Sequence, residues 1–155
     1  TGHLVFSTLH TNDAAGAVTR LQDMGVEGYL ISSSLLAIQA QRLVRRVCTD
    51  CAETHFLSED EAIVLEIGIS SCPKIQRGKG CERCGHTGYR GRVGLYELLM
   101  MSDAIRHHIA SGADANIIRD EAIIEGMKTL REDAIEKLKA GLTTPEEVVR
   151  VTRAI

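Results

Sequence analysis

The sequence predicts an α/β protein in which a small metal-binding unit separates an apolar α/β part from a helical C-terminal part. Three observations lead to this class. They are an apolar run near the N-terminus, two Cys-x-x-Cys pairs in the middle, and repeated helix start and stop signals towards the end. Of the 155 residues, 44% are apolar and 25% charged, as in ordinary globular proteins. We expect three parts with the boundaries 1–47, 48–94 and 95–155.

The first part alternates between a predicted strand and predicted helices. Residues 3–10 are mostly apolar, which is typical of a strand buried on both faces of a parallel sheet. The polar residues at 11–13 offer N-caps for a helix that ends before Gly25. A second helix is expected over about 28–40, and it should be well buried because it is apolar almost all round. A strand over 41–47 would follow it.

Four of the five cysteines form two pairs, Cys48 with Cys51 and Cys81 with Cys84, and 29 residues lie between the pairs. Two such pairs supply four thiolates, the ligand set of a tetrahedral structural zinc ion. The sequence shows no export signal, so we expect a reducing, cytosolic setting in which disulfides would not persist. The alternative is a set of unligated or redox-active thiols. For Cys72, which has no partner at ligand spacing, we expect a small, at least half-buried side chain.

The middle part is polar and rich in glycine, so a metal would have to supply folding energy that an apolar core cannot. Ser58 and Glu61 predict a capping box for a short acidic helix over about 59–67. The stretch 53–66 holds five acids and no lysine or arginine, whereas 74–92 holds six lysines and arginines and one acid. The basic stretch leaves open a zinc module that binds nucleic acid. The net charge of −3 and the 3% aromatic content argue against that alternative.

The last part is predicted to consist of four helices. Each start is marked by a residue type that caps helix N-termini or opens the first turn. These are Ser102, Asp114, Thr129 with Glu132, and Thr144 with Pro145. Gly112 and Gly141 are typical of helix C-termini, because glycine readily adopts the left-handed conformation that ends a helix.

His10 lies at the carboxyl end of the first predicted strand, just before a helix N-terminus. In open α/β sheets this is where ligands bind, and it offers hydrogen-bond donors to a phosphate or its attacking water. The alternative is an ordinary strand-end histidine beside a helix cap. His3 lies at the opposite end of the strand. The sequence contains no phosphate loop, nucleophile elbow or His-Glu-x-x-His motif, so its own residues form no complete catalytic set.

Several short motifs follow one another along the chain. They are TGHLVFSTLHTNDA at 1–14, LQDMG at 21–25, QRLVR at 41–45, the two cysteine pairs, and GYRGRVGLYE at 88–97. In this order they closely resemble the motor ATPases of type II secretion and type IV pilus assembly, and the first motif resembles their histidine box. The resemblance spans essentially the whole chain. The four cysteines favour the assembly branch over the retraction branch, which lacks them.

The resemblance implies a truncated RecA-like ATPase core, an inserted zinc subdomain and a C-terminal helical tail. The complete enzymes are hexameric, Mg²⁺-dependent ATPases at the cytoplasmic face of the inner membrane, where they act with an inner-membrane platform protein. By this resemblance His10 would approach the terminal phosphate or its water, His3 would support it, and Arg42 or Arg45 would lie near the nucleotide.

The motifs of this family that bind ATP and Mg²⁺ precede the histidine box. We therefore expect this chain to be the C-terminal part of a longer motor and to be inactive on its own. The alternative is a zinc-containing docking module for a partner protein, without catalysis.

Overall fold

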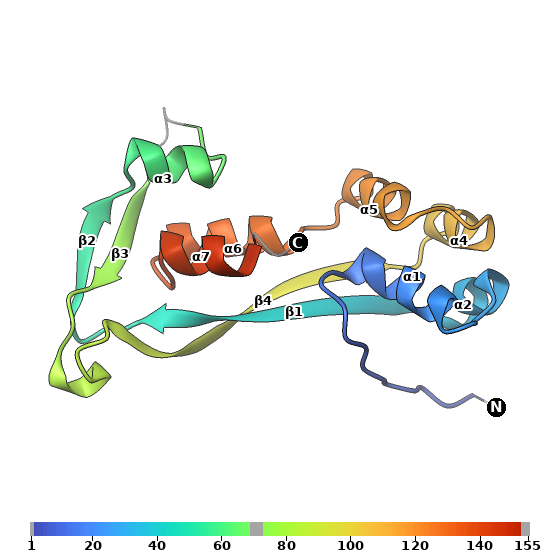
Figure 1. Ribbon diagram of the computed structural model, residues 1–155, viewed down its shortest axis with the longest axis horizontal. Coiled ribbons are helices and arrows are strands. Elements are labelled where there is room, and N and C mark those ends of the chain that lie inside the picture. The colour runs from blue at the N-terminus through green and yellow to red at the C-terminus, as the bar shows by residue number, and fades with distance from the viewer. Residues whose placement is uncertain (1, 69–72, 153–155) are drawn as a thin grey trace. The chain divides into compact units, whose positions relative to one another are not determined.

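The computed structural model describes residues 2–68 and 73–152, and Cys72 lies outside this range. The described residues form seven α-helices, a short 3₁₀ helix and four strands (Figure 1). Strand β1 (Ala37–Val47) pairs with β4 (Tyr89–Met100), and β2 (Ala52–Phe56) pairs antiparallel with β3 (Lys74–Gly78). No described helix is long and apolar enough to cross a membrane. The predicted mixed α/β class is confirmed at this level.

The chain folds into two compact units. Unit 1 takes the described residues of 1–40 and 98–127, and unit 2 takes those of 41–97 and 128–155. Both β1 and β4 contribute residues to each unit. The boundaries predicted from composition, after residues 47 and 94, stay a prediction.

Unit 1 is a group of four helices around an apolar core. The helices are α1 (Ala14–Asp23), α2 (Gly28–Ser34), α4 (Asp103–Ala110) and α5 (Ala115–Ile124). Helix α2 packs on α4, and α5 packs on both α1 and α4. The core is made of buried aliphatic side chains, among them Val18, Ile31, Ile105, Ile109 and Ile118. At Gly28 a Cβ atom would lie 2.7 Å from the Ile109 carbonyl oxygen, so only glycine allows the close approach of α2 to α4.

Helix α1 begins as the sequence predicts. Asp13 is its N-cap, and the carboxylate accepts a 2.6 Å hydrogen bond from the Gly16 N–H. The same carboxylate pairs with the Arg119 guanidinium of α5. Because Asp13 is buried, this ion pair holds the start of α1 against α5.

The predicted second helix is too long and too buried. Helix α2 ends at Ser34, and the backbone becomes extended at Leu35 before β1 begins at Ala37. Strand pairing with β4 takes residues 37–40 away from the helix, which is a tertiary effect. Helix α2 is also only partly covered, since Tyr29 stays 63% exposed.

The predicted strand over 3–10 is wrong in this structure. Residues 2–10 have no regular secondary structure and are exposed, including Phe6 at 89%. A buried strand requires neighbouring strands for its backbone hydrogen bonds. The described strands pair only with one another, as β1–β4 and β2–β3, so none of them extends a sheet to this run.

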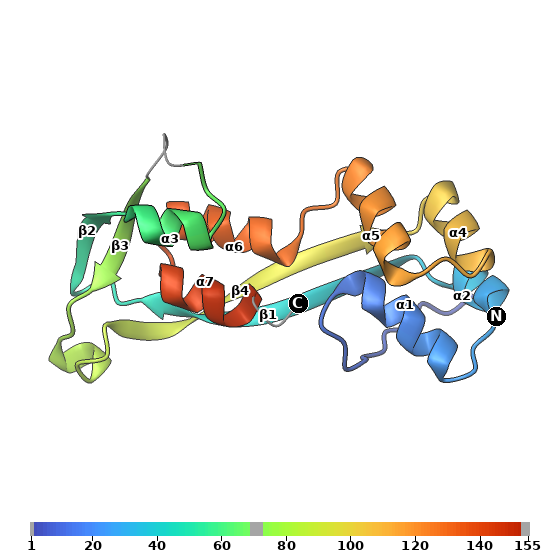
Figure 2. The same cartoon turned by 45° about the horizontal axis from the view of Figure 1, so that its top comes forward.

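Unit 2 contains the antiparallel pair β2–β3, α3 (Glu59–Val64), α6 (Leu130–Lys139) and α7 (Pro145–Thr152) (Figure 2). The capping boxes predicted at the starts of α3 and α6 are both formed. Helix α7 begins at Pro145, as predicted. The two helices α6 and α7 pack on each other, and α6 also contacts β3.

Carboxylates of α6 and α7 satisfy backbone donors on the two long strands. The Glu147 carboxylate of α7 accepts a 2.7 Å hydrogen bond from the Arg45 N–H of β1. The Asp133 carboxylate of α6 accepts a 2.8 Å bond from the Tyr96 N–H of β4. A two-stranded sheet has two open edges, so these contacts both protect the edges and attach the helices to them.

Candidate metal centre

The two cysteine pairs meet at one point in unit 2. The Sγ atoms of Cys48 and Cys81 are 4.0 Å apart, those of Cys51 and Cys84 3.9 Å, and those of Cys81 and Cys84 3.7 Å. All four lie within 4.8 Å of one another. A disulfide would require a separation of about 2.0 Å, so these are free thiols.

Each pair forms a tight turn of the same kind. The Cys51 N–H points to the Cys48 carbonyl at 3.4 Å, and the Cys84 N–H to the Cys81 carbonyl at 3.2 Å. The first turn connects β1 to β2, and the second begins the short 3₁₀ helix Glu82–Cys84. The antiparallel pair β2–β3 lies between the two turns and returns the chain to the first turn, which brings together cysteine pairs that are distant in sequence.

Two glycines allow the loops of the site to cross. A Cβ atom at Gly78 would lie 2.1 Å from the Gly88 carbonyl oxygen, and one at Gly88 would lie 2.3 Å from the Gly78 carbonyl oxygen. No other residue fits either position without moving the backbone. The Gly88 carbonyl also accepts the Cys48 N–H at 2.9 Å, which attaches the second turn to the end of β1.

The four thiols differ in their electrostatic environment. Hydrogen bonds from the Cys81 and Gly88 N–H groups, at 3.2 and 3.3 Å from its sulfur, lower the pKa of Cys84 to about 6 despite its burial. Burial raises the pKa of Cys51 to about 12. Without a metal, Cys84 therefore loses its proton more readily than Cys51. Because a metal binds thiolates, metal binding releases protons.

Charged groups surround the sulfurs. The Asp50 carboxylate lies 3.9 Å from the Cys48 sulfur and pairs with Arg83 at 3.5 Å and Arg90 at 3.2 Å. A tetrathiolate zinc centre carries a net charge of about −2, and the Asp50 carboxylate adds a further negative charge, so these two guanidinium groups would offset the total in part. Asp50 escaped the sequence analysis, although its place inside the first cysteine pair is a signal that could have identified it.

The donor set fits a tetrahedral metal ion. A Zn–S distance of about 2.3 Å places the sulfurs of a regular tetrahedron about 3.8 Å apart, close to the three separations of 3.7, 3.9 and 4.0 Å. Cys48, Cys51 and Cys84 are buried, and Cys81 is half-buried. The arrangement can hold a structural metal and, having four protein ligands, has no open position for a substrate.

The other predicted site residues belong to different units. His3 and His10 are exposed and belong to unit 1, within the irregular segment 2–10. Arg42 and Arg45 belong to unit 2, on β1. The proposed roles of these four residues stay predictions.

Arg45 forms an ion pair with Glu147, a residue that the sequence analysis did not identify. Its guanidinium pairs with the buried Glu147 carboxylate at 3.0 Å and stacks 4.1 Å from the centre of the Tyr89 ring. Glu147 also accepts two hydrogen bonds from Arg150. These bonds outweigh burial and lower the pKa of Glu147 to about 2. No local pattern indicates this contact, because Glu147 is 102 positions from Arg45.

Comparisons with known proteins give matches to one family over nearly the whole chain. The family model described as "Type II/IV secretion system protein" matches residues 1–150. The type II secretion system protein E of Aeromonas hydrophila is 48% identical over 99% of this chain and 30% of its own length. The type IV pilus assembly ATPase PilB of Thermus thermophilus is 49% identical over 98% of this chain and 17% of its own length. The type II secretion system ATPase E of Vibrio cholerae is 46% identical, over 99% and 30%. The chain thus spans less than a third of these relatives.

Proposed function

We propose that this chain, which belongs to the type II/IV secretion system protein family, is the C-terminal part of a motor ATPase that drives pilus or pseudopilus assembly. The observation that carries the proposal is the identity of nearly one half, over almost all of this chain, to relatives named as a type IV pilus assembly ATPase and a type II secretion system ATPase. The intact motor would be a hexamer that binds Mg²⁺ and ATP in a RecA-like core.

In this proposal His10 acts at the terminal phosphate or on the attacking water, and His3 supports the same segment. Residues 2–10 are exposed and lie directly before α1, whose start is held by the buried pair of Asp13 and Arg119. The apolar run around His10 would become a sheet strand when neighbouring strands of the motor core lie beside it.

Arg42 or Arg45 would approach the nucleotide. For Arg45 this requires release from Glu147 and Tyr89, which hold it in the present structure. Because arginine binds carboxylate and phosphate with the same fork of N–H donors, Glu147 would compete with a phosphate for this guanidinium.

The four cysteines would hold one zinc ion whose role is structural. When bound, the metal supplies cross-linking between β1, the start of β2 and the short 3₁₀ helix. The chain itself supplies the cradle: two backbone N–H groups directed at Cys84, and Asp50 with its two arginines beside Cys48.

The zinc unit, residues 48–94, would dock a partner protein, and this role is compatible with the motor. Ion pairs within the chain favour protein docking over nucleic-acid binding. Most bases of 74–92 already pair with carboxylates of the chain: Arg77 with Glu61 and Glu146, Lys79 with Glu53, and Arg83 and Arg90 with Asp50. Little unpaired positive charge is left for a phosphate backbone. We propose the platform protein of the inner membrane as the partner, at the cytoplasmic face.

ATP hydrolysis by the complete protein that carries this segment tests the motor. Replacing His10 by alanine should lower kcat by about 10²- to 10⁴-fold, the usual contribution of a group that assists proton transfer or positions the nucleophile. The same replacement at His55, an exposed histidine of β2, is the matched control and should leave kcat near wild type.

The isolated 155-residue chain should hydrolyse no ATP. Hydrolysis by the isolated chain would contradict the assignment of this segment as a catalytically incomplete part.

For the complete protein, an unchanged kcat of the His10→Ala variant would show that His10 takes no part in the reaction.

A further inference from the structure

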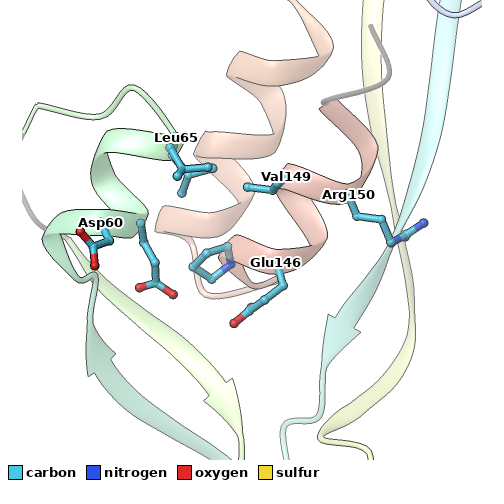
Figure 3. Close-up of a pocket in the computed structure, with 8 residues that line it drawn as sticks. Asp60, Leu65, Glu146, Val149 and Arg150 are labelled. Carbon is cyan, nitrogen blue, oxygen red and sulfur yellow. The ribbon is translucent and has the colours of Figure 1, made fainter.

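An apolar groove of about 560 Å³ lies between α3 and α7 in unit 2. Its walls are aliphatic side chains from both helices and their ends: Val64, Leu65, Pro145 and Val149. Figure 3 shows Val149 pointing from α7 towards α3. Arg150 also lines the groove, but its charged end is directed away from it. The volume is in the range of about 300–1,000 Å³ that is usual for binding clefts.

Carboxylates line the mouth of this groove. Asp60, Glu61 and Glu146 lie along it, and Glu61 and Glu146 share a single cation, the Arg77 guanidinium. Arg150 forms an ion pair with the buried Glu147 carboxylate, so it does not neutralise the carboxylates at the mouth of the groove. Within residues 2–68 and 73–152, Asp60 forms no ion pair. The groove therefore combines apolar walls with unneutralised negative charge.

The backbone around the groove restricts the kind of ligand. Both walls are helices rather than strands, so an extended peptide would find no strand edge to pair with. A segment that satisfies its own backbone, with apolar residues at i, i+3, i+4 and i+7, fits such walls.

We propose that the α3–α7 groove is a docking site for a basic amphipathic helix of a partner protein. Its apolar face would contact Val64 and Val149, and its lysines or arginines would meet Asp60 and the neighbouring carboxylates. The proposal does not rest on ATP hydrolysis, because no residue of the groove belongs to the histidine segment.

The test is a binding titration of the zinc-loaded 155-residue chain with a labelled helical peptide of about 18 residues, made of leucine and lysine at amphipathic spacing. We expect saturable binding, at least tenfold tighter than that of the same peptide with glutamate in place of lysine. Asp60→Asn should weaken binding of the lysine peptide.

Val149→Glu separates specific docking from charge attraction. It adds a negative charge, so unspecific attraction to the lysine peptide would increase, whereas a blocked groove should lower affinity at least tenfold. Val64→Glu, on the opposite wall and 43% exposed, repeats the test should Val149→Glu fail to fold. Ile124→Glu makes the same exchange at a 78% exposed site of unit 1 and should bind like wild type.

Three outcomes would overturn the proposal. They are equal binding of both peptides, unchanged or tighter lysine-peptide binding by the folded groove variants, and self-association of the chain that Val149→Glu abolishes. The last result would mean that a second copy covers the groove. ATP hydrolysis by the complete protein is measured separately, so failure of the groove leaves the motor assignment standing.

Discussion

Unit 1 and the cysteine centre of unit 2 are held together in opposite ways. In unit 1 the core consists of apolar side chains, most of them from four helices, and several of them are completely buried. In the cysteine centre the buried cluster consists of the cysteines alone. The stability of unit 1 is the sum of many small contributions, because apolar burial contributes about 25 cal/mol for each Å² removed from water. With the proposed zinc ion bound, the cysteine centre would depend on one ion and should be lost in a single step when that ion leaves.

Loss of one cysteine is expected to have the largest effect and would separate the two regions most clearly. Structural zinc contributes an apparent 10–16 kcal/mol, roughly, in small zinc domains, and Cys81→Ser removes one of the four ligands. We expect loss of bound zinc and fast hydrogen exchange over 48–56 and 74–91, while α1, α2, α4 and α5 keep their protection. Cys72→Ser, which changes the cysteine without a partner at ligand spacing, should retain zinc.

Equal loss of protection in both units of the Cys81→Ser protein would show that they unfold together. The comparison drawn above would then be wrong.

A cavity in unit 1 should have the converse effect. Ile109 is completely buried in the core of unit 1, and truncation to alanine should cost about 2–5 kcal/mol there. Denaturant titration followed by helix signals would measure this loss. Zinc content should stay unchanged, whereas zinc release in the Ile109→Ala protein would mean that the cysteine centre requires a folded unit 1.

Glu147 is expected to give a smaller, pH-dependent effect. The pKa of its carboxyl is about 2 in the folded protein and about 4.3 in an unfolded chain, so the folded state holds the proton less tightly. Its stabilising contribution is therefore complete above about pH 5 and is lost as the pH falls towards 2.

Glu147→Gln should lower the free energy of unfolding at pH 7 by about 1–3 kcal/mol. This loss is small because the side chains of Arg45 and Arg150 are 52% and 55% exposed, so water can solvate their guanidinium groups in the variant. The variant should also lose less stability than wild type between pH 5 and 2, as followed by acid unfolding. An identical acid profile would show that the carboxylate is not linked to folding.

Much of this protein can be predicted from local patterns. The capping residues Asp13, Ser58, Ser102, Asp114 and Thr129 all begin helices, since a cap acts within three or four positions of itself. The meeting of the four cysteines was also predicted, because the spacing within each pair specifies a turn that directs both sulfurs to one side.

Other features depend on partners that are distant in sequence, and only the tertiary structure decided them. Residues 37–40 joined β1 rather than α2 because β4 offers strand pairing, and residues 3–10 stayed irregular because no described strand lies beside them. The ion pair between Glu147 and Arg45 likewise joins residues that are 102 positions apart in the sequence. By itself, then, the sequence determined the helix starts and the metal-ligand turns, where the interacting groups are neighbours along the chain. Strand partners, buried ion pairs and the groove between α3 and α7 required the fold, since their energies come from groups that only folding brings into contact.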